Sequence, residues 1–344
     1  MTTSRELPKV AVLSLGGTIA STNEGASGAA DGVTPQLDAD DLVAAVPQLR
    51  RFADIETTAF RQIPSGDLTL TDLVALAGEI DRRFEAGAVG VVVTQGTDTM
   101  EETSFALDLL VRAERPVVVT GAMRNPTLAG ADGPANLLAA VQVAASPDAV
   151  GLGTLVVAND EIHAARFVRK THSSSPATFR SPTAGPLGWI IEGRPRIVLR
   201  VARLKGVPSG AHSMVPAVAL LTAVLGDDAR LLATLEGLGY AGLIIEAFGG
   251  GHVPAVIMPA LADVASRLPV VLASRTGSGE VLRDTYGFPG SERDMLERGL
   301  ISAGFLDGPK SRILLSLLLS DGLDRSEVRR AFELVNSSVS SFGD

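Results

Sequence analysis

The chain contains no cysteine among its 344 residues, and it has only four histidines. The absence of cysteine excludes disulfide bonds, thiolate metal ligands and a cysteine nucleophile. The histidines, at positions 163, 172, 212 and 252, never show the H-x-x-x-H spacing of a helical zinc site. We therefore expect no bound metal.

Long apolar runs are missing as well. No run approaches the roughly 18 uninterrupted apolar residues that a membrane-spanning helix requires. The first nine residues lack the apolar segment of a secretory signal. Hydrophobic residues make up 46% of the chain in short runs, which is enough for a sizeable core. We expect a cytoplasmic protein that has no membrane partner.

Basic residues are fewer than acidic residues. The chain has 30 lysines and arginines against 39 aspartates and glutamates, which gives a formal net charge of −9. An acidic chain of this kind is a poor partner for nucleic acid. Lysine occurs only at positions 9, 170, 205 and 310, and arginine supplies the remaining cations. Because lysine, unlike arginine, can lose its proton in a protein, a lysine near a reactive centre merits attention.

Short apolar runs alternate with segments of helical periodicity through the first two-thirds of the chain. This alternation predicts an α/β fold with a doubly wound, mostly parallel sheet and helices on both faces. The expected strands cover residues 10–15, 55–60, 89–94, 116–120 and 152–158, and the expected helices cover residues 40–45, 71–86, 100–113 and 135–145. Asp98 and Glu101 have the spacing of a capping box for the third helix.

The pattern changes after residue 185. Residues 188–200 predict a hairpin with its turn at 193–195. Alternation then resumes with expected strands at 217–222, 242–247 and 270–273 and expected helices at 227–238, 256–267, 309–319 and 325–335. We predict a larger N-terminal domain over residues 1–203, a linker over 204–214 and a smaller C-terminal α/β domain over 215–344.

Two strand ends carry the most informative residues. Residues 13–22 (LSLGGTIAST) and 91–102 (VVVTQGTDTMEE) each read as a buried strand that enters a turn and presents a threonine. In an open parallel sheet, ligands bind beyond the carboxyl ends of the strands, so we expect Thr18 and Thr97 at one centre. Gly16 and Gly17 permit positive φ and a close backbone approach. Residues 21–33 are rich in small residues and predict either a mobile lid or an ordinary surface loop.

Three further side chains indicate possible chemistry. Thr97 can hold a water molecule, and Asp98 can bind an amine or orient a base. Lys170 follows the strand at 152–158 in a polar loop, where partial desolvation would let it take a proton from a hydroxyl or from water. The set would then parallel a Ser-His-Asp triad, with lysine as the base. The alternatives are that Thr18 and Asp98 only cap helices and that Lys170 is a solvated surface residue.

The chain resembles the bacterial L-asparaginase family, which hydrolyses asparagine to aspartate and ammonia. Its two signatures match LGGTIA at 15–20 and TQGTDTMEET at 94–103, and further matches are TGAMR at 120–124, ADGPANL at 131–137, ATFRSP at 177–182 and YGF at 286–288. The matches extend over essentially the whole chain. The resemblance implies an asparaginase that needs no cofactor, acts on L-asparagine and forms a homotetramer, a dimer of dimers.

The resemblance also implies catalytic roles. Thr18 matches the family's nucleophile, which would form an acyl-threonine intermediate with the substrate. Thr97 matches the threonine that holds the attacking water. Asp98 and Lys170 match the aspartate and lysine beside it, and both Thr97 and Asp98 also contact the substrate.

Four positions match the family's substrate-binding residues or their neighbours. Ser65 matches the serine that grips the α-carboxylate, and Gly66 follows it. The carbonyl of Ala122 matches the one that meets the side-chain amide. An acid from the partner subunit helps to bind the α-amino group, and the spacing to Tyr286 assigns it to Glu280.

The chain departs from the family in three places. The lid tyrosine that contacts the nucleophile is missing, and Val33 and Thr34 occupy the matching neighbourhood. Gly66 stands where a glutamine is common, and residues 249–251 read Gly-Gly-Gly instead of Gly-Asn-Gly. These changes leave the catalytic efficiency and the preference for asparagine or glutamine open. A related amidohydrolase with glutamine or another amide as substrate, and a weakly active amino-acid-binding homologue, remain alternatives.

Overall fold

The computed structural model describes residues 6–17, 19, 21–22, 34–35, 39–204 and 215–337. The chain divides into two compact units, Met1–Arg203 and Leu204–Asp344. Apart from Leu204, the predicted linker at 204–214 lies outside the described residues, so these domain boundaries stay a prediction. Within the described part of the chain, no helix is long and apolar enough to cross a membrane.

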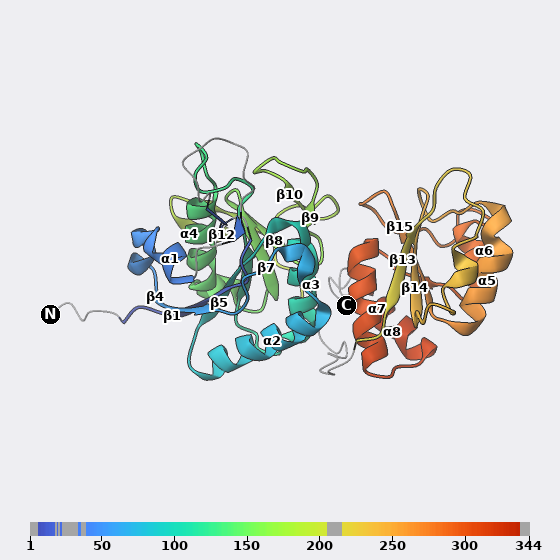
Figure 1. Cartoon of the computed structure of the whole chain (residues 1–344), viewed down its shortest axis with the longest axis horizontal. Helices are drawn as coiled ribbons and strands as arrows, with labels where there is room; N and C mark the ends of the chain where they lie inside the picture. The colour runs from blue at the N-terminus through green and yellow to red at the C-terminus, as the bar shows by residue number, and fades with distance from the viewer. Residues whose placement is uncertain are drawn as a thin grey trace. The chain divides into compact units, whose positions relative to one another are not determined.

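The first unit is built on an eight-stranded sheet (Figure 1). Its strands, in spatial order, are β12 (Arg194–Ile197), β11 (Gly188–Ile191), β8 (Glu161–Ala164), β7 (Thr154–Ala158), β6 (Val117–Thr120), β5 (Gly90–Thr94), β1 (Lys9–Ser14) and β4 (Asp54–Ala59). The five strands from β7 to β4 are parallel, and the other three run antiparallel to their neighbours. The predicted mostly parallel sheet is therefore confirmed.

Helices cover both faces of this sheet. On one face α1 (Ala39–Ala44) and α4 (Gly133–Ala144) pack on alternate residues of the strands, including Val10, Val92 and Val118. On the other face lie α2 (Leu70–Glu85) and α3 (Met100–Leu110), which contact β5, β6 and β7 (Figure 1). Because successive strand residues point to opposite faces, an apolar strand with helices on both sides has no solvated face.

The hairpin of β11 and β12 turns one residue earlier than predicted. Ile191 pairs with Arg194, so the turn is Glu192–Gly193, and both residues have positive φ, at 50° and 70°. Two left-handed residues match the twist of the flanking strands. Arg194 and Pro195 therefore belong to β12, an edge strand, where a residue without an N–H is tolerated.

The second unit contains a four-stranded parallel sheet. Its strands are β13 (Val218–Thr222), β14 (Gly242–Ala247), β15 (Val270–Ser274) and β16 (Ile301–Ser302). Its helices are α5 (Met258–Arg267), α6 (Glu292–Glu297), α7 (Gly308–Ser320) and α8 (Arg325–Ser337). Leu243, Ile245 and Leu272 face α5 and α6, and α7 covers the opposite face of the sheet (Figure 1). The predicted smaller α/β domain is confirmed as a fold.

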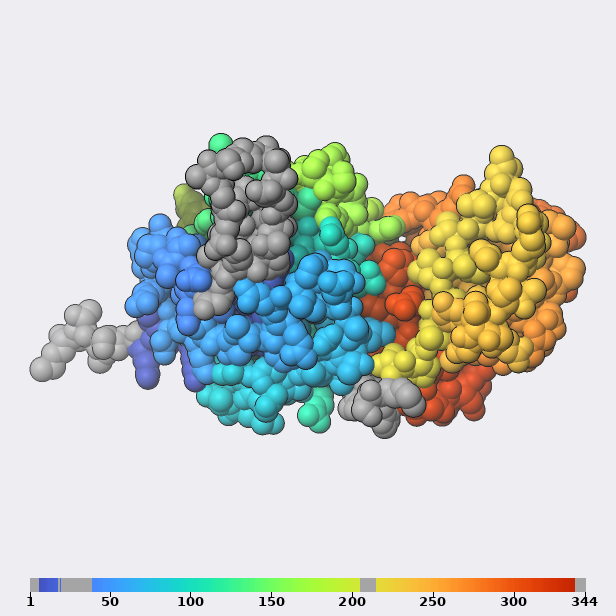
Figure 2. Space-filling model, in the orientation of Figure 1, coloured from blue at the N-terminus to red at the C-terminus, as the bar shows by residue number. Residues whose placement is uncertain are grey.

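The helix predicted at 227–238 is wrong. Only the short 3-10 helix η6 (Leu232–Thr234) forms there. Ala229 adopts a positive φ of 66°, which an α-helix excludes, and Leu231 and Leu238 stay more than 60% exposed. The apolar residues of this segment therefore do not form one buried face. Figure 2 shows that the yellow part of the chain, which includes this segment, covers much of the visible face of the second unit.

Candidate active site

The carboxyl ends of four parallel strands lie level with one another. Ser14, the last residue of β1, pairs with Ala59 of β4 and with Thr94 of β5. Thr94 in turn pairs with Thr120, the last residue of β6. The turns that follow these strands therefore meet at one edge of the sheet, where ligands bind in open α/β folds.

The two glycines after β1 allow these turns to touch. Gly16 and Gly17 have φ of 96° and 87°, as their sequence predicted. A Cβ atom at Gly17 would lie 2.0 Å from the backbone nitrogen of Gly96, and one at Gly16 would lie 2.9 Å from that of Ile63. Any side chain at either position would force the strand ends apart.

Thr97 and Ser65 occupy neighbouring short helices, η4 (Thr97–Thr99) and η3 (Ser65–Asp67). Both residues are buried, and the Thr99 hydroxyl donates to the carbonyl of Ser65 at 2.9 Å. A Cβ atom at Gly96 would lie 2.8 Å from Ser65 Oγ, so Gly96 leaves just enough room for that hydroxyl. Within the described part of the chain, Ser65 Oγ has no hydrogen-bond partner, which leaves it free for a ligand.

Lys170 joins this cluster from a distant part of the chain. It lies on the two-residue strand β9 (Arg169–Lys170), which pairs with β10 (Phe179–Arg180), and not in an open loop as predicted. Its Nζ donates to Thr97 Oγ1 at 2.9 Å and to Asp98 Oδ1 at 2.6 Å. The Lys170 side chain is only 14% exposed, whereas that of Asp98 is 80% exposed. The lysine thus connects a buried hydroxyl with a carboxylate at the surface.

Glu101 holds the backbone of this lysine. The predicted capping box of Asp98 and Glu101 is wrong, because no side chain caps η4 or α3. Glu101 Oε2 instead accepts a hydrogen bond from the Lys170 amide at 2.7 Å. Residues that would ordinarily cap a helix are therefore used to position Lys170. The crowding of polar residues at 95–102 was the only sequence signal for this role.

The loop after β6 closes the cluster on its other side. Ala122 is buried, and a Cβ atom at the preceding Gly121 would lie 2.5 Å from the carbonyl oxygen of Gln95 and 3.2 Å from the Thr97 methyl group. The backbone of residues 121–122 therefore lies directly against the Thr97 turn. At Gly66 a Cβ atom would have no neighbour within 4 Å, so the space that glutamine could occupy is open.

The remaining predicted residues are not part of this cluster as described. Thr18 lies outside the described residues, and so does the predicted lid at 21–33 apart from the short strand β2 (Ser21–Thr22). Glu280 belongs to the second unit, where its carboxylate is 3.6 Å from Arg283. The Gly249–Gly251 segment also belongs to that unit, and a Cβ atom at Gly250 would lie 2.5 Å from a Leu282 methyl carbon. Among the described residues, no three His, Asp or Glu side chains are grouped as metal ligands.

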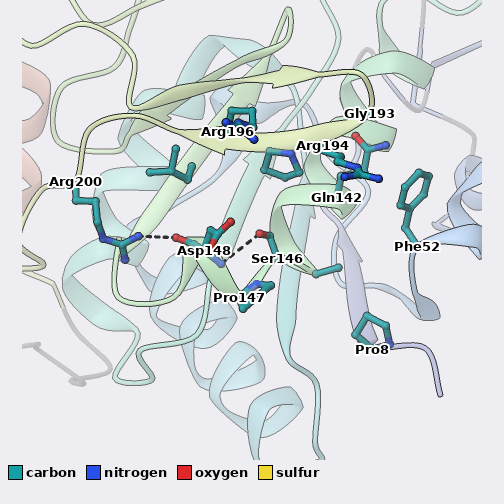
Figure 3. A pocket seen from close by; sticks show the side chains of 13 residues that line it. Pro8, Phe52, Gln142, Ser146, Pro147, Asp148, Gly193, Arg194, Arg196 and Arg200 are labelled. Atoms are coloured by element: carbon teal, nitrogen blue, oxygen red, sulfur yellow. Dashed lines mark hydrogen bonds between the residues drawn. The ribbon is translucent and has the colours of Figure 1, made fainter. Parts of the chain in front are cut away.

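A cavity of about 920 Å³ lies elsewhere in the first unit (Figure 3). Its walls include Pro8, which precedes β1, together with Gln142 near the end of α4 and the hairpin turn at Gly193. Arg200 closes one side by donating to the backbone carbonyls of Asp148 and Val150. None of the predicted site residues lines this cavity, so its size does not make it the reaction centre.

The comparisons with known proteins cover nearly all of the chain. Residues 9–202 match the family model "Asparaginase, N-terminal", and residues 217–332 match "Glutaminase/Asparaginase C-terminal domain". A "Probable L-asparaginase" from Deinococcus radiodurans is 37% identical, over 95% of this chain and 97% of its own length. A "Probable L-asparaginase periplasmic" from Haemophilus influenzae is 34% identical, over 95% and 93%.

A solved structure is similar to this chain over the same share of its length. The "Probable Cytoplasmic L-asparaginase" from Campylobacter jejuni has a TM-score of 0.86 and 34% sequence identity. The match covers 95% of this chain and 99% of that one, so both units correspond.

Proposed function

The chain belongs to the asparaginase family, and on this premise we propose a mechanism in which Thr18 is the nucleophile. The protein is an L-asparaginase, an amidohydrolase that converts L-asparagine to L-aspartate and ammonia. We assign proton transfer to Thr97 and Lys170, and substrate binding to Ser65, Asp98 and their neighbours.

The pair of contacts made by Lys170 carries this proposal. Its Nζ lies within hydrogen-bond distance of both Thr97 Oγ1 and Asp98 Oδ1. Because Thr97 Oγ1 accepts from the ammonium group, its own hydrogen remains available to the substrate or to water. A hydroxyl linked in this way to a partly buried lysine can pass a proton in either direction.

In the first step, Thr18 Oγ attacks the side-chain carboxamide carbon of asparagine, and the carbonyl π electrons move to its oxygen. We assign stabilisation of this oxyanion to the glycine-rich turn and neighbouring donors. When the tetrahedral intermediate collapses, the carbon–nitrogen bond breaks. Ammonia leaves with the proton that Thr18 has lost, and an acyl-threonine remains.

In the second step, water beside Thr97 attacks the acyl-threonine ester. Lys170 enters this step as the neutral amine: the water loses a proton to the Thr97 hydroxyl, and the hydroxyl passes its own proton to Lys170 Nζ, from which it returns by the same route to the leaving Thr18 oxygen. The carbon–oxygen bond to Thr18 then breaks, the threonine oxygen regains a proton, and L-aspartate is released. Lys170 therefore has to change its protonation state during the cycle, which arginine could not do.

Two polar groups of the cluster suit the charged end of the substrate. The Ser65 hydroxyl, which is buried and has no partner among the described residues, can donate to the α-carboxylate. Asp98 uses Oδ1 for Lys170, and its second oxygen can accept from the α-amino group. The open space beside Gly66 allows the substrate's main-chain atoms to approach the backbone there. The Ala122 carbonyl is assigned to the side-chain amide.

We further assign a homotetramer, in which Glu280 reaches the site of a partner subunit. The surface near Glu280 supports this assignment, because Leu282, Tyr286 and Phe288 are each more than a third exposed. Exposed apolar and aromatic groups beside an acidic residue suit an interface between subunits. Cytoplasmic residence has support from the name of the Campylobacter structure, and cell fractionation tests it against the periplasmic location named for the Haemophilus relative.

Ammonia release tests the proposed nucleophile. L-Asparagine and L-glutamine are incubated in parallel with the wild type, Thr18→Ala and Thr22→Ala, the last being a nearby threonine without an assigned role. We expect asparagine turnover by the wild type and Thr22→Ala, and its loss in Thr18→Ala. A Thr18→Ala enzyme that keeps more than about a tenth of the activity contradicts the assignment, since nucleophile removal costs orders of magnitude in rate. Trapping an acyl-enzyme mass adduct only in chains with Thr18 completes the test.

A further inference from the structure

The loop that follows β6 is held by the start of α4. Asp132 occupies the N-cap position of that helix, yet its side chain caps none of the helix's own amides. Its two carboxylate oxygens instead accept from the backbone amides of Met123 at 3.0 Å and Arg124 at 2.8 Å. A carboxylate so placed fixes two successive peptide groups and gives up the stabilisation that capping would provide.

Asn136, one turn further along α4, holds the loop on the other side of Ala122. Its Nδ2 donates to the carbonyl of Gly121 at 2.9 Å and to Asp132 Oδ2 at 3.1 Å. Its Oδ1 accepts from the backbone amide of Asn159 at 2.9 Å, at the end of β7. Asn136 is only 3% exposed, and all three of these hydrogen bonds are internal. The amide thus ties the loop to both the helix and the neighbouring strand.

The result is a rigid frame around Ala122. The backbone carbonyl before it and the backbone amides after it are all occupied by Asn136 and Asp132. The Ala122 side chain also packs against the start of α4, where a Cβ atom at Gly133 would lie 3.3 Å from its own Cβ. The Ala122 carbonyl itself has no hydrogen-bond partner among the residues that the structure describes.

This carbonyl belongs to the residue that follows Gly121, beside the Thr97 turn of the candidate site. The Gly121 backbone lies against the Gln95 carbonyl and the Thr97 methyl group, so the following residue borders the Thr97 turn. A carbonyl oxygen can accept a hydrogen bond from the carboxamide NH₂ of the substrate but offers nothing to an ester. We propose that Asp132 and Asn136 are positioning residues that aim the Ala122 carbonyl at the scissile amide nitrogen. This inference rests on the proposed function.

The physical consequence is selectivity for amides over esters. A held acceptor keeps the carboxamide plane oriented for attack and stabilises the nitrogen as it becomes the leaving group. If the frame loosens, amide hydrolysis loses this orientation, whereas hydrolysis of the matching ester does not depend on it. The ratio of the two activities therefore reports on the carbonyl and not on the general integrity of the site.

Steady-state kinetics with L-asparagine and L-aspartate β-methyl ester test the inference. The variants are Asp132→Asn, Asn136→Ala and Asp132→Glu, and the matched control is Asp148→Asn, a carboxylate just beyond the other end of α4. We expect Asp132→Asn and Asn136→Ala to lower kcat/KM for the amide at least tenfold and that for the ester less than threefold. We expect Asp132→Glu to recover part of the amide activity and Asp148→Asn to leave both activities unchanged.

The outcomes distinguish a failure of this inference from a failure of the proposed function on which it rests. An unchanged amide-to-ester ratio in Asp132→Asn and Asn136→Ala overturns it, whether both activities fall equally or neither falls. A ratio that falls equally in Asp148→Asn overturns it as well. If the wild type hydrolyses neither substrate, the proposed function fails before the positioning role is reached. Retained ester hydrolysis shows directly that a variant is folded.

Discussion

At the scale of single residues, Lys170 shows how a side chain gains a role from its partners. A lysine ammonium is a compact charge whose proton can be shared when the group is partly buried. Here the charge is held between Thr97 Oγ1 and Asp98 Oδ1, and its backbone amide is fixed by Glu101. The position of the ammonium group is therefore set from two directions.

Replacement of this lysine tests its part in proton transfer. We expect Lys170→Met to lower kcat for asparagine by roughly 100-fold or more, because general acid–base catalysis contributes about that much. KM should change much less, since Ser65 and Asp98 remain. The control is Lys9→Met. Lys9 lies on β1, and its Nζ pairs with Glu56 Oε2 of β4 at 2.8 Å. An equal loss in both variants, or a pH–rate profile that Lys170→Met leaves unaltered, would assign Lys170 a structural role.

His163 is a buried residue of β8 to which no catalytic role is assigned, and its protonation state affects the stability of the fold. It is 1% exposed, and its Nδ1 forms a hydrogen bond with Ser181 Oγ at 3.0 Å. Its Nε2 lies 3.3 Å from Glu161 Oε2, but the angles do not allow a hydrogen bond between them. Burial lowers the pKa of His163 to about 4, although Glu161 favours the charged form. The folded protein therefore holds this imidazole neutral at pH values where the unfolded chain already protonates it.

The sign of the pH effect follows from this difference. Between about pH 6.5 and 4 the unfolded state binds the extra proton, so the free energy of unfolding falls as the pH falls, by up to roughly 3 kcal/mol. We expect His163→Asn, which can keep a hydrogen bond to Ser181, to lose less stability than the wild type over this range. Denaturant unfolding at about pH 7.5 and about pH 4.5 measures the difference. Parallel pH dependences of the two proteins would contradict a neutral buried histidine.

At the scale of elements, the turn after β1 depends on the absence of side chains. Gly17 approaches the Gly96 backbone so closely that a methyl group has no place, and its φ of 87° disfavours any other residue. This contact holds the turn after β1 against the turn that carries Thr97. The spacing between the two turns is therefore set by glycine.

Substitution of Gly17 tests this coupling. We expect Gly17→Ala to lower both the melting temperature and kcat, because the β1 and β5 turns have to separate. The matched control is Gly78→Ala in α2, where a Cβ atom meets nothing within 4 Å. Since alanine favours a helix over glycine, the control should gain up to about 1 kcal/mol of stability. Thermal melting and asparagine turnover are measured on both, and full activity in Gly17→Ala would refute the coupling.

At the scale of the whole molecule, the proposed homotetramer is what remains to be tested. Lys170 and Thr97 belong to the first unit, and Glu280 belongs to the second. We expect a sedimentation mass about four times the chain mass of 35.6 kDa. We also expect Glu280→Gln to raise KM for asparagine without a change in that mass. Glu297→Gln, an exposed carboxylate paired with Arg293 on α6, serves as its control.

Mixing two defective variants shows whether Glu280 acts across subunits. Lys170→Met and Glu280→Gln chains are dissociated together and reassembled. If one chain supplies the lysine and its partner supplies the glutamate, some sites in mixed tetramers contain both native residues, and activity returns. Activity that never exceeds the sum of the separate variants, or a mass near that of one chain, would contradict this assembly.

Much of this molecule follows from the sequence by itself. The mostly parallel α/β sheet was predictable because buried strands, helical periodicity and glycine turns are properties of short segments. The level strand ends that bring Thr97, Ser65 and Ala122 together then follow from the rules of parallel sheets. Local signals failed where they conflicted, as in the 227–238 segment, which has helical spacing but no single buried face.

Only the tertiary structure decided which polar groups meet. Lys170 is 73 residues away from Thr97 in the chain, and their contact depends on the placement of β9 beside η4. Asp98 and Glu101 have the sequence signature of helix capping, and Asp132 stands at the N-cap position of α4, yet their side chains bind Lys170 and the Ala122 loop instead. Capping is a local choice, but a carboxylate takes whichever donors the packed fold brings nearest. Which donors reach a carboxylate depends on the packing of segments that are far apart in the chain, so no single segment of the sequence predicts the outcome.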